Sequence, residues 1–190
     1  MTARGQLVVI SGPSGAGKTS VCRALKLHPE VEFSVSATTR APRLGERDGV
    51  DYHFLSRDDF QRRIAENQFL EWATYAGNLY GTPRWPMDQA LARGRTFLVE
   101  IEVKGTRQLR ERGVPGLYLF IAPPSIDELR HRLQKRGSND AAEIEQRVRI
   151  AADELAAARD SVGGTPIYDV ILENVDLDRT IDAVRRLLWP

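Results

Sequence analysis

Eight residues near the start of the chain, GPSGAGKT from Gly12 to Thr19, constrain its fold more than any other feature. They match the phosphate-loop pattern G-x-x-x-x-G-K-[ST] in full. The continuous apolar run 6–10 precedes them, and apolar residues at helical spacing follow from Lys18 to about Lys26. This order of strand, glycine loop and helix is half of a βαβ unit, so it predicts a buried parallel strand that leads into a helix.

A loop of this kind binds the phosphates of a nucleotide. Its glycines let successive backbone N–H groups turn inward around an anion, and the N-terminus of the following helix adds partial positive charge. Lys18 is expected to reach the outer phosphates, and the Thr19 hydroxyl to bind the Mg²⁺ that accompanies ATP. A plain connecting turn is the alternative, and the strand and helix in the required places count against it. The predicted ATP-binding residues of the loop are Gly12, Pro13, Ser14, Gly15, Ala16, Gly17, Lys18, Thr19 and Ser20.

Short apolar runs recur along the chain and alternate with helical patterns. Further strands are predicted at 96–101, 116–121 and 168–172, and helices at 56–66, 87–93, 103–111, 140–159 and 178–188. Ser125 and Glu128 have the spacing of a capping box that opens one more helix. The alternation indicates an α/β fold, a mostly parallel P-loop sheet flanked by helices on both faces. The turn-rich segment 33–55 departs from the pattern and is predicted to form the short strands of a small inserted lobe.

Length, charge and cysteine content limit the class of protein. A chain of 190 residues is expected to form one compact domain. With 27 basic and 26 acidic residues the net charge is +1, so neither a nucleic acid nor a membrane is an expected partner. We find no signal peptide and no apolar run long enough to span a membrane, and therefore expect a cytoplasmic protein. The single cysteine, Cys22, excludes an intramolecular disulfide and is predicted to be buried in the core.

A second group of candidate functional residues lies in the turn-rich segment. Arg40 and Arg43 are three residues apart, and Tyr52 follows in the same segment. Because a guanidinium binds phosphate oxygens in a bidentate manner, two arginines and a phenol could hold a monophosphate. The alternative is a pair of arginines that only solvate a loop.

Five motifs together resemble a known family. They are GPSGAGKT, FSVSATTRAPR, GVDYHF, the pair Glu71-Trp72, and LYGTPR, and they occur in this order along the chain. The combination resembles the bacterial type of guanylate kinase, and the similarity extends from about Gln6 to about Val184. It implies a nucleoside monophosphate kinase that transfers the γ-phosphoryl group of ATP to GMP with Mg²⁺, giving ADP and GDP. The oligomeric state stays open.

The resemblance also implies which residues hold the acceptor. The GMP phosphate would be held by Arg40, Arg43, Tyr52 and Tyr80. Glu71 would accept hydrogen bonds from the ring N–H and the amine of guanine, with the Ser36 and Thr82 hydroxyls at another edge. Adenine presents a ring acceptor where guanine presents a donor, so a buried carboxylate there would reject AMP. Without the resemblance, an exposed surface position would be the usual one for Glu71.

Three arginines are implied to act in catalysis beside Lys18. By the resemblance Arg132, Arg136 and Arg147 belong to a mobile lid that closes on ATP and excludes water. Phosphoryl transfer depends on positioning and on neutralising charge at the equatorial oxygens, which is what these cations would supply. No histidine is needed as a base, because the attacking phosphate oxygen is already anionic near neutral pH.

Three residues are assigned where the chain departs from the common family pattern. Glu100 and Glu102 alternate at the end of a predicted strand and so share a face. Both are assigned to the GMP side, near the guanine, the ribose or the waters of Mg²⁺. Asn174 is assigned to the adenine pocket of the ATP site.

The resemblance divides one domain, 1–190, into three parts. The parts are a core of 1–33, 86–125 and 160–190, a GMP-binding lobe of about 34–85, and a lid of about 126–159. Two other functions stay open at this point: a catalytically inactive binding module of the same fold, and a related kinase that acts on a sugar phosphate. A sugar phosphate would not require the base-binding set Ser36, Glu71 and Thr82.

Overall fold

The computed structural model describes residues 5–75, 77–135 and 141–189 of the chain. Its centre is a five-stranded sheet in the order β11-β8-β1-β7-β2, in which every neighbouring pair is parallel. The strands are β1 Gln6–Ser11, β2 Val31–Phe33, β7 Thr96–Glu100, β8 Leu117–Ala122 and β11 Val170–Glu173. The predicted parallel α/β sheet is confirmed.

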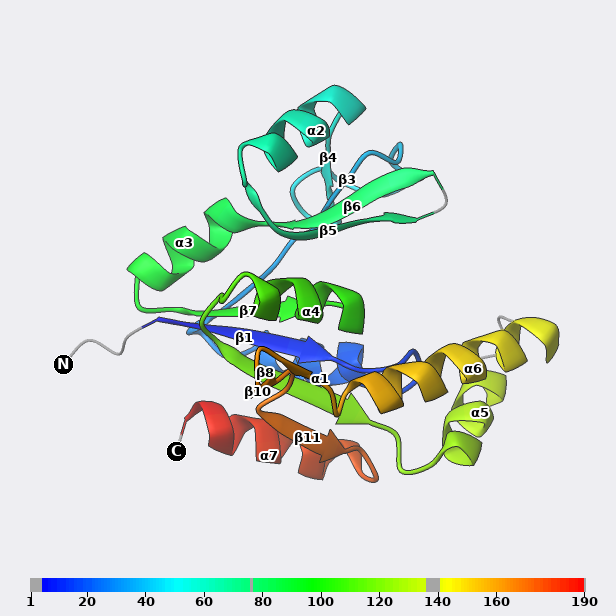
Figure 1. Ribbon diagram of the computed structural model, residues 1–190. Helices are drawn as coiled ribbons and strands as arrows, with labels where there is room; N and C mark the ends of the chain where they lie inside the picture. Colours follow the sequence, from blue (N-terminus) through cyan, green and yellow to red (C-terminus); the bar gives the residue numbers. More distant parts are fainter. Residues whose placement is uncertain (1–4, 76, 136–140, 190) are drawn as a thin grey trace.

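The apolar run of β1 is explained by burial on both faces of the sheet. Leu7 and Val9 point into one hydrophobic cluster, while Val8 and Ile10 point into the other. Helices α1 (Lys18–Leu25) and α7 (Leu177–Leu188) cover the second cluster. Helices α3 (Arg84–Ala92) and α4 (Val103–Glu111) cover the first. Figure 1 shows α4 above β1 and α7 at the bottom of the molecule, so the two-faced arrangement is also as predicted. Cys22 is buried in the second cluster, as expected.

A separate lobe is inserted between β2 and α3 and lies above the core (Figure 1). Its sheet has the order β4-β3-β6-β5, and α2 (Arg57–Ala65) packs on it. The strands are β3 Ala37–Thr38, β4 His53–Phe54, β5 Phe69–Tyr75 and β6 Asn78–Pro83. Phe60 of α2 and Phe69 of β5 stack with ring centroids 4.3 Å apart, which gives the lobe its own small core.

Two helices project from the carboxyl end of β8. They are α5 (Ile126–Lys135) and α6 (Ala141–Ala157), and they share a hydrophobic cluster of their own. The backbone N–H of Glu128 donates to the Ser125 hydroxyl at 3.0 Å, so the predicted cap of α5 is confirmed. A short hairpin of β9 (Ser161–Val162) and β10 (Thr165–Pro166) leads from α6 to β11.

The predicted elements differ from the observed ones in two ways. Helix α3 begins at Arg84 rather than at residue 87, because Pro86 lies in its first turn, where a missing N–H breaks no helical hydrogen bond. The longest strands of the lobe, β5 and β6, and the hairpin β9-β10 were not predicted at all. The lobe was predicted to have short strands only in 33–55, where β3 and β4 lie, while β2 ends at Phe33 and belongs to the central sheet.

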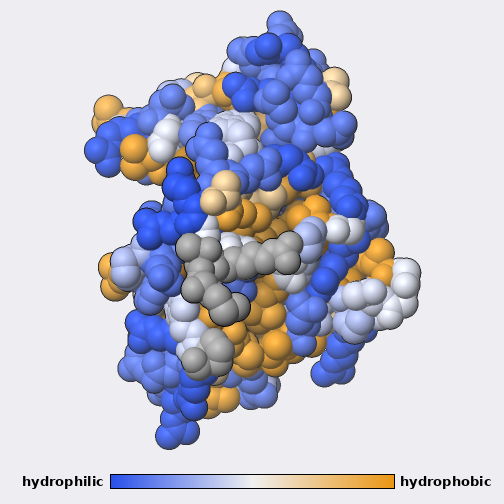
Figure 2. Space-filling view, turned by 90° about the vertical axis from the view of Figure 1, so that its left-hand side faces the viewer, coloured by the Kyte–Doolittle hydropathy of each residue, from blue (hydrophilic) through white to orange (hydrophobic). Residues whose placement is uncertain are grey.

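The polarity of the surface differs between the lobe and the core. Seen from the side where both chain ends lie, it is largely hydrophilic over the lobe, whereas apolar residues gather over the core (Figure 2). None of the helices in the described ranges has the length and apolar character that a membrane span requires.

Candidate active site

The phosphate loop leaves β1 at its carboxyl end and packs closely on the neighbouring strands. Gly12, Gly15 and Gly17 have φ angles of 142°, 93° and 101°. A side chain at Gly12 would run into the carbonyl oxygen of Ile121, and one at Gly17 into the side-chain amide of Asn174. Glycine is therefore required at both positions for conformation and for space.

Lys18 opens helix α1 and folds back on the loop. Its Nζ donates to the carbonyl oxygens of Gly12 at 2.6 Å and Pro13 at 3.1 Å. Burial lowers the pKa of Lys18, while the carboxylates of Glu100, Glu154 and Glu102 act in the opposite direction. The ammonium thus has neutral carbonyls as hydrogen-bond partners, which anionic phosphate oxygens could replace with a charge-assisted bond.

Thr19, the residue assigned to magnesium, contacts a carboxylate from the neighbouring strand. Its hydroxyl donates to Oε1 of Glu100 at 2.8 Å. Glu100 was assigned to the GMP side, and the structure places it against the phosphate loop. A hydroxyl and a carboxylate are hard oxygen donors of the kind that Mg²⁺ prefers. The ranges that the structure describes contain no group of three or more His, Cys, Asp or Glu able to hold a metal. The pair therefore fits a Mg²⁺ that takes its other oxygens from phosphates and water.

Asn174 is hydrogen-bonded to the phosphate loop. The residue is 4% exposed; its Nδ2 donates to the carbonyl of Ala16 at 2.7 Å, and its Oδ1 accepts from the Thr180 hydroxyl at 3.0 Å. Arg132 of α5 donates to the backbone carbonyl of Asn174 at 3.0 Å and to Glu128 at 2.8 Å. The assigned adenine contact of Asn174 stays a prediction, and its observed contacts are with the protein.

These contacts surround a cavity beside the loop. It has a volume of about 330 Å³, and its lining residues are Gly15, Gly17, Ser20, Arg132, Lys135, Asn174 and Leu177. The structure thus brings Arg132 to the loop. Arg147 lies on α6 and donates to Glu143 at 2.9 Å. Arg136 lies outside the described residues.

The predicted acceptor-phosphate residues gather in the lobe. The Arg40 guanidinium lies over the Tyr52 ring, 5.5 Å from its centroid, and the Tyr52 and Tyr80 rings are 6.1 Å apart. A carboxylate missed in the sequence holds this arginine: Glu46 accepts from Nη2 of Arg40 at 2.8 Å and from the backbone N–H of Arg43 at 2.7 Å. Its place three residues after Arg43, in the same turn, is the signal that could have identified it.

Glu71 of β5 is half-buried rather than exposed, with a hydroxyl beside it. The Thr82 hydroxyl donates to Oε1 of Glu71 at 2.6 Å, and Thr82 itself is 1% exposed. Burial raises the pKa of Glu71, and the hydrogen bonds with Thr82 oppose the shift. Ser36 precedes β3, where its carbonyl accepts from the His53 N–H at 2.8 Å. A half-buried carboxylate with one oxygen so bound can still accept hydrogen bonds from a planar donor pair.

The charge of Glu102 influences groups in both the lobe and the phosphate loop. Its charge acts on Glu71, where it raises the pKa, and also on Lys18, where it favours the ammonium. Glu102 is exposed and is the N-cap residue of α4. The end of β7 contacts the phosphate loop through Glu100, and α4, which follows it, approaches Glu71 closely at Gly105.

Glu154 of α6 is a further charged residue near Lys18 that the sequence analysis missed. It shares a helical stripe with buried Ala151 and Ala158, and a carboxylate on such a stripe was the available signal. Burial raises the pKa of Glu154 to about 7; Lys18 opposes the shift and Glu102 adds to it.

This shift predicts how stability changes with pH. The folded state holds the Glu154 proton more tightly than the unfolded state, so the free energy of unfolding falls as pH rises from about 4.5 to about 7. In Glu154→Gln this pH-dependent fall in the free energy of unfolding is absent, because glutamine does not titrate. The variant should gain on the order of 1 kcal/mol relative to wild type between pH 4.5 and pH 7.5, after allowance for solvent screening. Urea unfolding of both proteins at the two pH values measures this, and parallel losses in both would contradict it.

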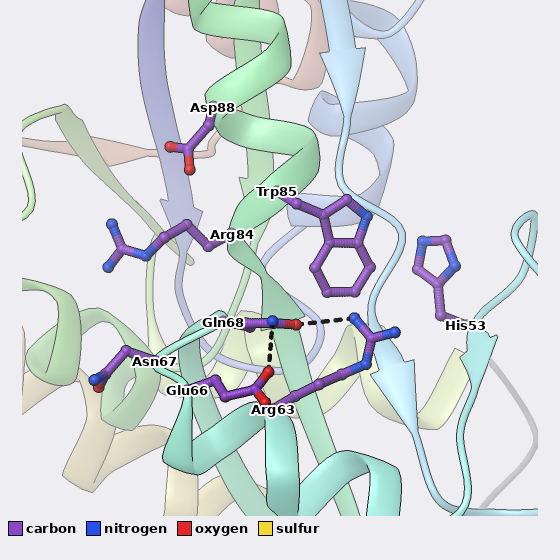
Figure 3. A pocket seen from close by; sticks show the side chains of 8 residues that line it. All are labelled: His53, Arg63, Glu66, Asn67, Gln68, Arg84, Trp85 and Asp88. Carbon is purple, nitrogen blue, oxygen red and sulfur yellow. Dashed lines mark hydrogen bonds between the residues drawn. The ribbon is translucent and has the colours of Figure 1, made fainter.

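A second hollow, of about 510 Å³, is lined by residues of the lobe and of helix α3 (Figure 3). The Arg63 guanidinium lies 4.7 Å from the centroid of the Trp85 ring and donates to Gln68 at 3.1 Å, while Gln68 donates to Glu66 at 2.7 Å. None of the site residues predicted from the sequence lines it. The larger hollow is therefore not the candidate site.

Comparisons with known proteins agree with this geometry. A protein-family model described as "Guanylate kinase" matches residues 4–190. The guanylate kinase of Thermosynechococcus vestitus is 46% identical over 186 residues, which cover 97% of this chain and 94% of that protein. That of Desulfitobacterium hafniense is 42% identical over 185 residues, covering 97% and 89%. A crystal structure of guanylate kinase from Anaplasma phagocytophilum has a TM-score of 0.68 at 29% identity, covering 99% of this chain and 86% of that one.

Proposed function

Because this chain belongs to the guanylate kinase family, we propose that its own residues transfer the γ-phosphoryl group of ATP to GMP, giving ADP and GDP. The resemblance inferred from the motifs is confirmed, and the chain is an ATP-dependent nucleotide kinase. One observation carries the assignment of the base: the Glu71 carboxylate is half-buried and accepts from the Thr82 hydroxyl at 2.6 Å.

The donor binds at the phosphate loop. Backbone N–H groups of the loop, which Pro13 alone lacks, and the N-terminus of α1 surround the β- and γ-phosphates. Lys18 leaves the carbonyls of Gly12 and Pro13 and binds the outer phosphate oxygens. Asn174 holds the carbonyl of Ala16, so the loop keeps its shape when the lysine moves.

Thr19 and Glu100 would hold Mg²⁺ on the donor side. The Thr19 hydroxyl would be a ligand, and Glu100, which accepts a hydrogen bond from it, would orient it or bind the waters of the ion. When bound, Mg²⁺ neutralises phosphate charge and orients the phosphates.

The acceptor binds in the lobe. Arg40, Arg43, Tyr52 and Tyr80 hold its phosphate, and Glu46 keeps Arg40 oriented over the Tyr52 ring. Glu71 accepts hydrogen bonds from the ring N–H and the amine of guanine, and Ser36 and Thr82 approach its other edge.

The chemical step needs little from the protein beyond position and charge. An anionic oxygen of the GMP phosphate forms a bond to the γ-phosphorus, and the bond from that phosphorus to the β–γ bridging oxygen breaks, so ADP leaves. Lys18 and the lid arginines Arg132, Arg136 and Arg147 neutralise charge on the transferred group. We propose that the core, the lobe of about 34–85 and the lid of about 126–159 act as three parts of one domain and that the reaction takes place in the cytoplasm.

Neither alternative considered from the sequence is favoured by the family match. The test is to incubate the protein with Mg-ATP and GMP, AMP, CMP, UMP or a ribose phosphate and to identify the product by chromatography. We expect GDP from GMP and at least about 100-fold slower turnover of AMP, since a site built to bind ring donors leaves polar groups unpaired with adenine. A diphosphate from another acceptor at equal or greater rate, or no product from any, would refute the proposal.

A further inference from the structure

We propose that one stripe of helix α4, formed by Gly105, Gln108 and Arg112, positions the Glu71 carboxylate for base recognition. These residues are three and four positions apart, so they lie on the same helical face. None of them needs to touch GMP, and each acts through strand β5. The proposal rests on the proposed function, because it takes Glu71 as the group that binds guanine.

Gln108 binds the backbone of the residue after Glu71 at both of its polar groups. Its Nε2 donates to the carbonyl of Trp72 at 3.0 Å, and its Oε1 accepts from the Trp72 N–H at 3.3 Å. The side-chain amide therefore pairs with β5 as another strand would. This pairing fixes the position of strand β5, and its rotation about its own axis, next to the Glu71 carboxylate.

Arg112 binds the residues before Glu71. The pairing of β5 with β6 shifts register between Phe69 and Glu71, which is a β-bulge. Nη1 of Arg112 donates to the carbonyls of Phe69 at 3.1 Å and Leu70 at 3.0 Å. The arginine thus satisfies backbone oxygens at the bulge, where the ladder is disrupted, and a bulge commonly changes the direction in which a neighbouring side chain points.

Gly105 leaves room for the carboxylate itself. A Cβ atom at this position would lie 3.0 Å from Oε2 of Glu71 and 3.2 Å from its Cδ and Cγ. Glu71 therefore rests on the first turn of α4, held between that turn and the Thr82 hydroxyl. Gly105 serves here through close approach, since its φ angle is not in the left-handed region.

The stripe links the base site to the core that carries the phosphate loop. Helix α4 packs on the central sheet through Val103 and Leu109, and the bulge residue Leu70 joins the same cluster. Phe69, one residue earlier, packs in the separate core of the lobe. Strand β5 is thus the boundary between lobe and core, and α4 determines where Glu71 stands relative to Lys18.

The experiment replaces Gln108 by leucine, which keeps the side chain's size and removes both hydrogen bonds to Trp72. We expect the KM for GMP to rise about tenfold, since two backbone groups lose their partners, while the KM for ATP stays unchanged. The preference for GMP over AMP should fall with it. Glu111→Gln, on the exposed side of the same helix, is the matched control and should behave as wild type.

Two results would overturn the proposal. One is wild-type kinetics for both nucleotides in folded Gln108→Leu; the other is an equal loss for ATP and GMP together with a lower Tm, which is what a packing role alone predicts. If that variant does not fold, Arg112→Met is judged by the same criteria, with Arg112→Lys expected to restore part of the GMP affinity. Failure of the proposed function is distinguishable, because Glu71→Gln would then discriminate GMP from AMP as wild type does.

Discussion

Replacement of Lys18 by alanine should lower kcat for ATP-dependent GDP formation by roughly 100- to 1,000-fold, the usual cost of losing one charged donor at a transferring group. The protein should stay folded, because the Nζ of Lys18 bonds only to the carbonyls of Gly12 and Pro13 among the described residues. Removing a half-buried cation whose pKa is lowered by desolvation also relieves a desolvation cost. The expected loss therefore belongs to catalysis rather than to stability.

A coupled assay of ADP release measures this effect, with the thermal unfolding of each protein as a check on its fold. Lys26→Ala is the matched control, because Lys26 is exposed at the end of the same helix. The control should turn over as wild type does. Near wild-type kcat in Lys18→Ala would show that the loop does not contact the transferred phosphoryl group.

The core of the fold was predictable because its signals are local. A strand buried on both faces is mostly apolar, and the residues 7–10 are, so β1 was located to within one residue. Helix α4 was predicted at its observed bounds, since its apolar face follows the helical period. Strands β5 and β6 were missed because exposed and buried residues do not alternate evenly along them: β5 ends in three exposed residues and contains a bulge.

The site was predictable only where a motif carries its chemistry. The glycine loop specifies its own conformation, and Lys18 and Thr19 follow from it. Gln108 binds a residue 36 positions away, and Arg112 binds residues 42 and 43 positions away. No local sequence pattern could therefore predict these contacts. Glu46 and Glu154 look like ordinary surface charges until the structure places them against Arg40 and near Lys18. Glu100 was assigned to the acceptor side from the strand pattern alone. Such a pattern predicts on which face of the sheet a side chain lies, but not which residue it contacts.

Glu71→Gln should lower kcat/KM for GMP by roughly 100-fold or more, because an amide turns one acceptor oxygen into a donor that faces the donors of guanine. The same change should leave kcat/KM for AMP unchanged or slightly raise it, since the new N–H can donate to the ring acceptor of adenine. The Thr82 hydroxyl can still donate to the remaining oxygen, so the strand pair is expected to hold. Glu66→Gln, the same substitution at an exposed position of the lobe, is the matched control and should not alter either constant.

The central claim is that a single cleft takes the phosphates of ATP at the Lys18 loop and selects guanine through the half-buried carboxylate of Glu71. The ratio of kcat/KM for GMP to kcat/KM for AMP, measured for wild type and Glu71→Gln under the same conditions, tests it most directly. The account predicts a large ratio in the wild type and its fall by roughly 100-fold or more in the variant. An equal ratio in the two proteins would contradict it.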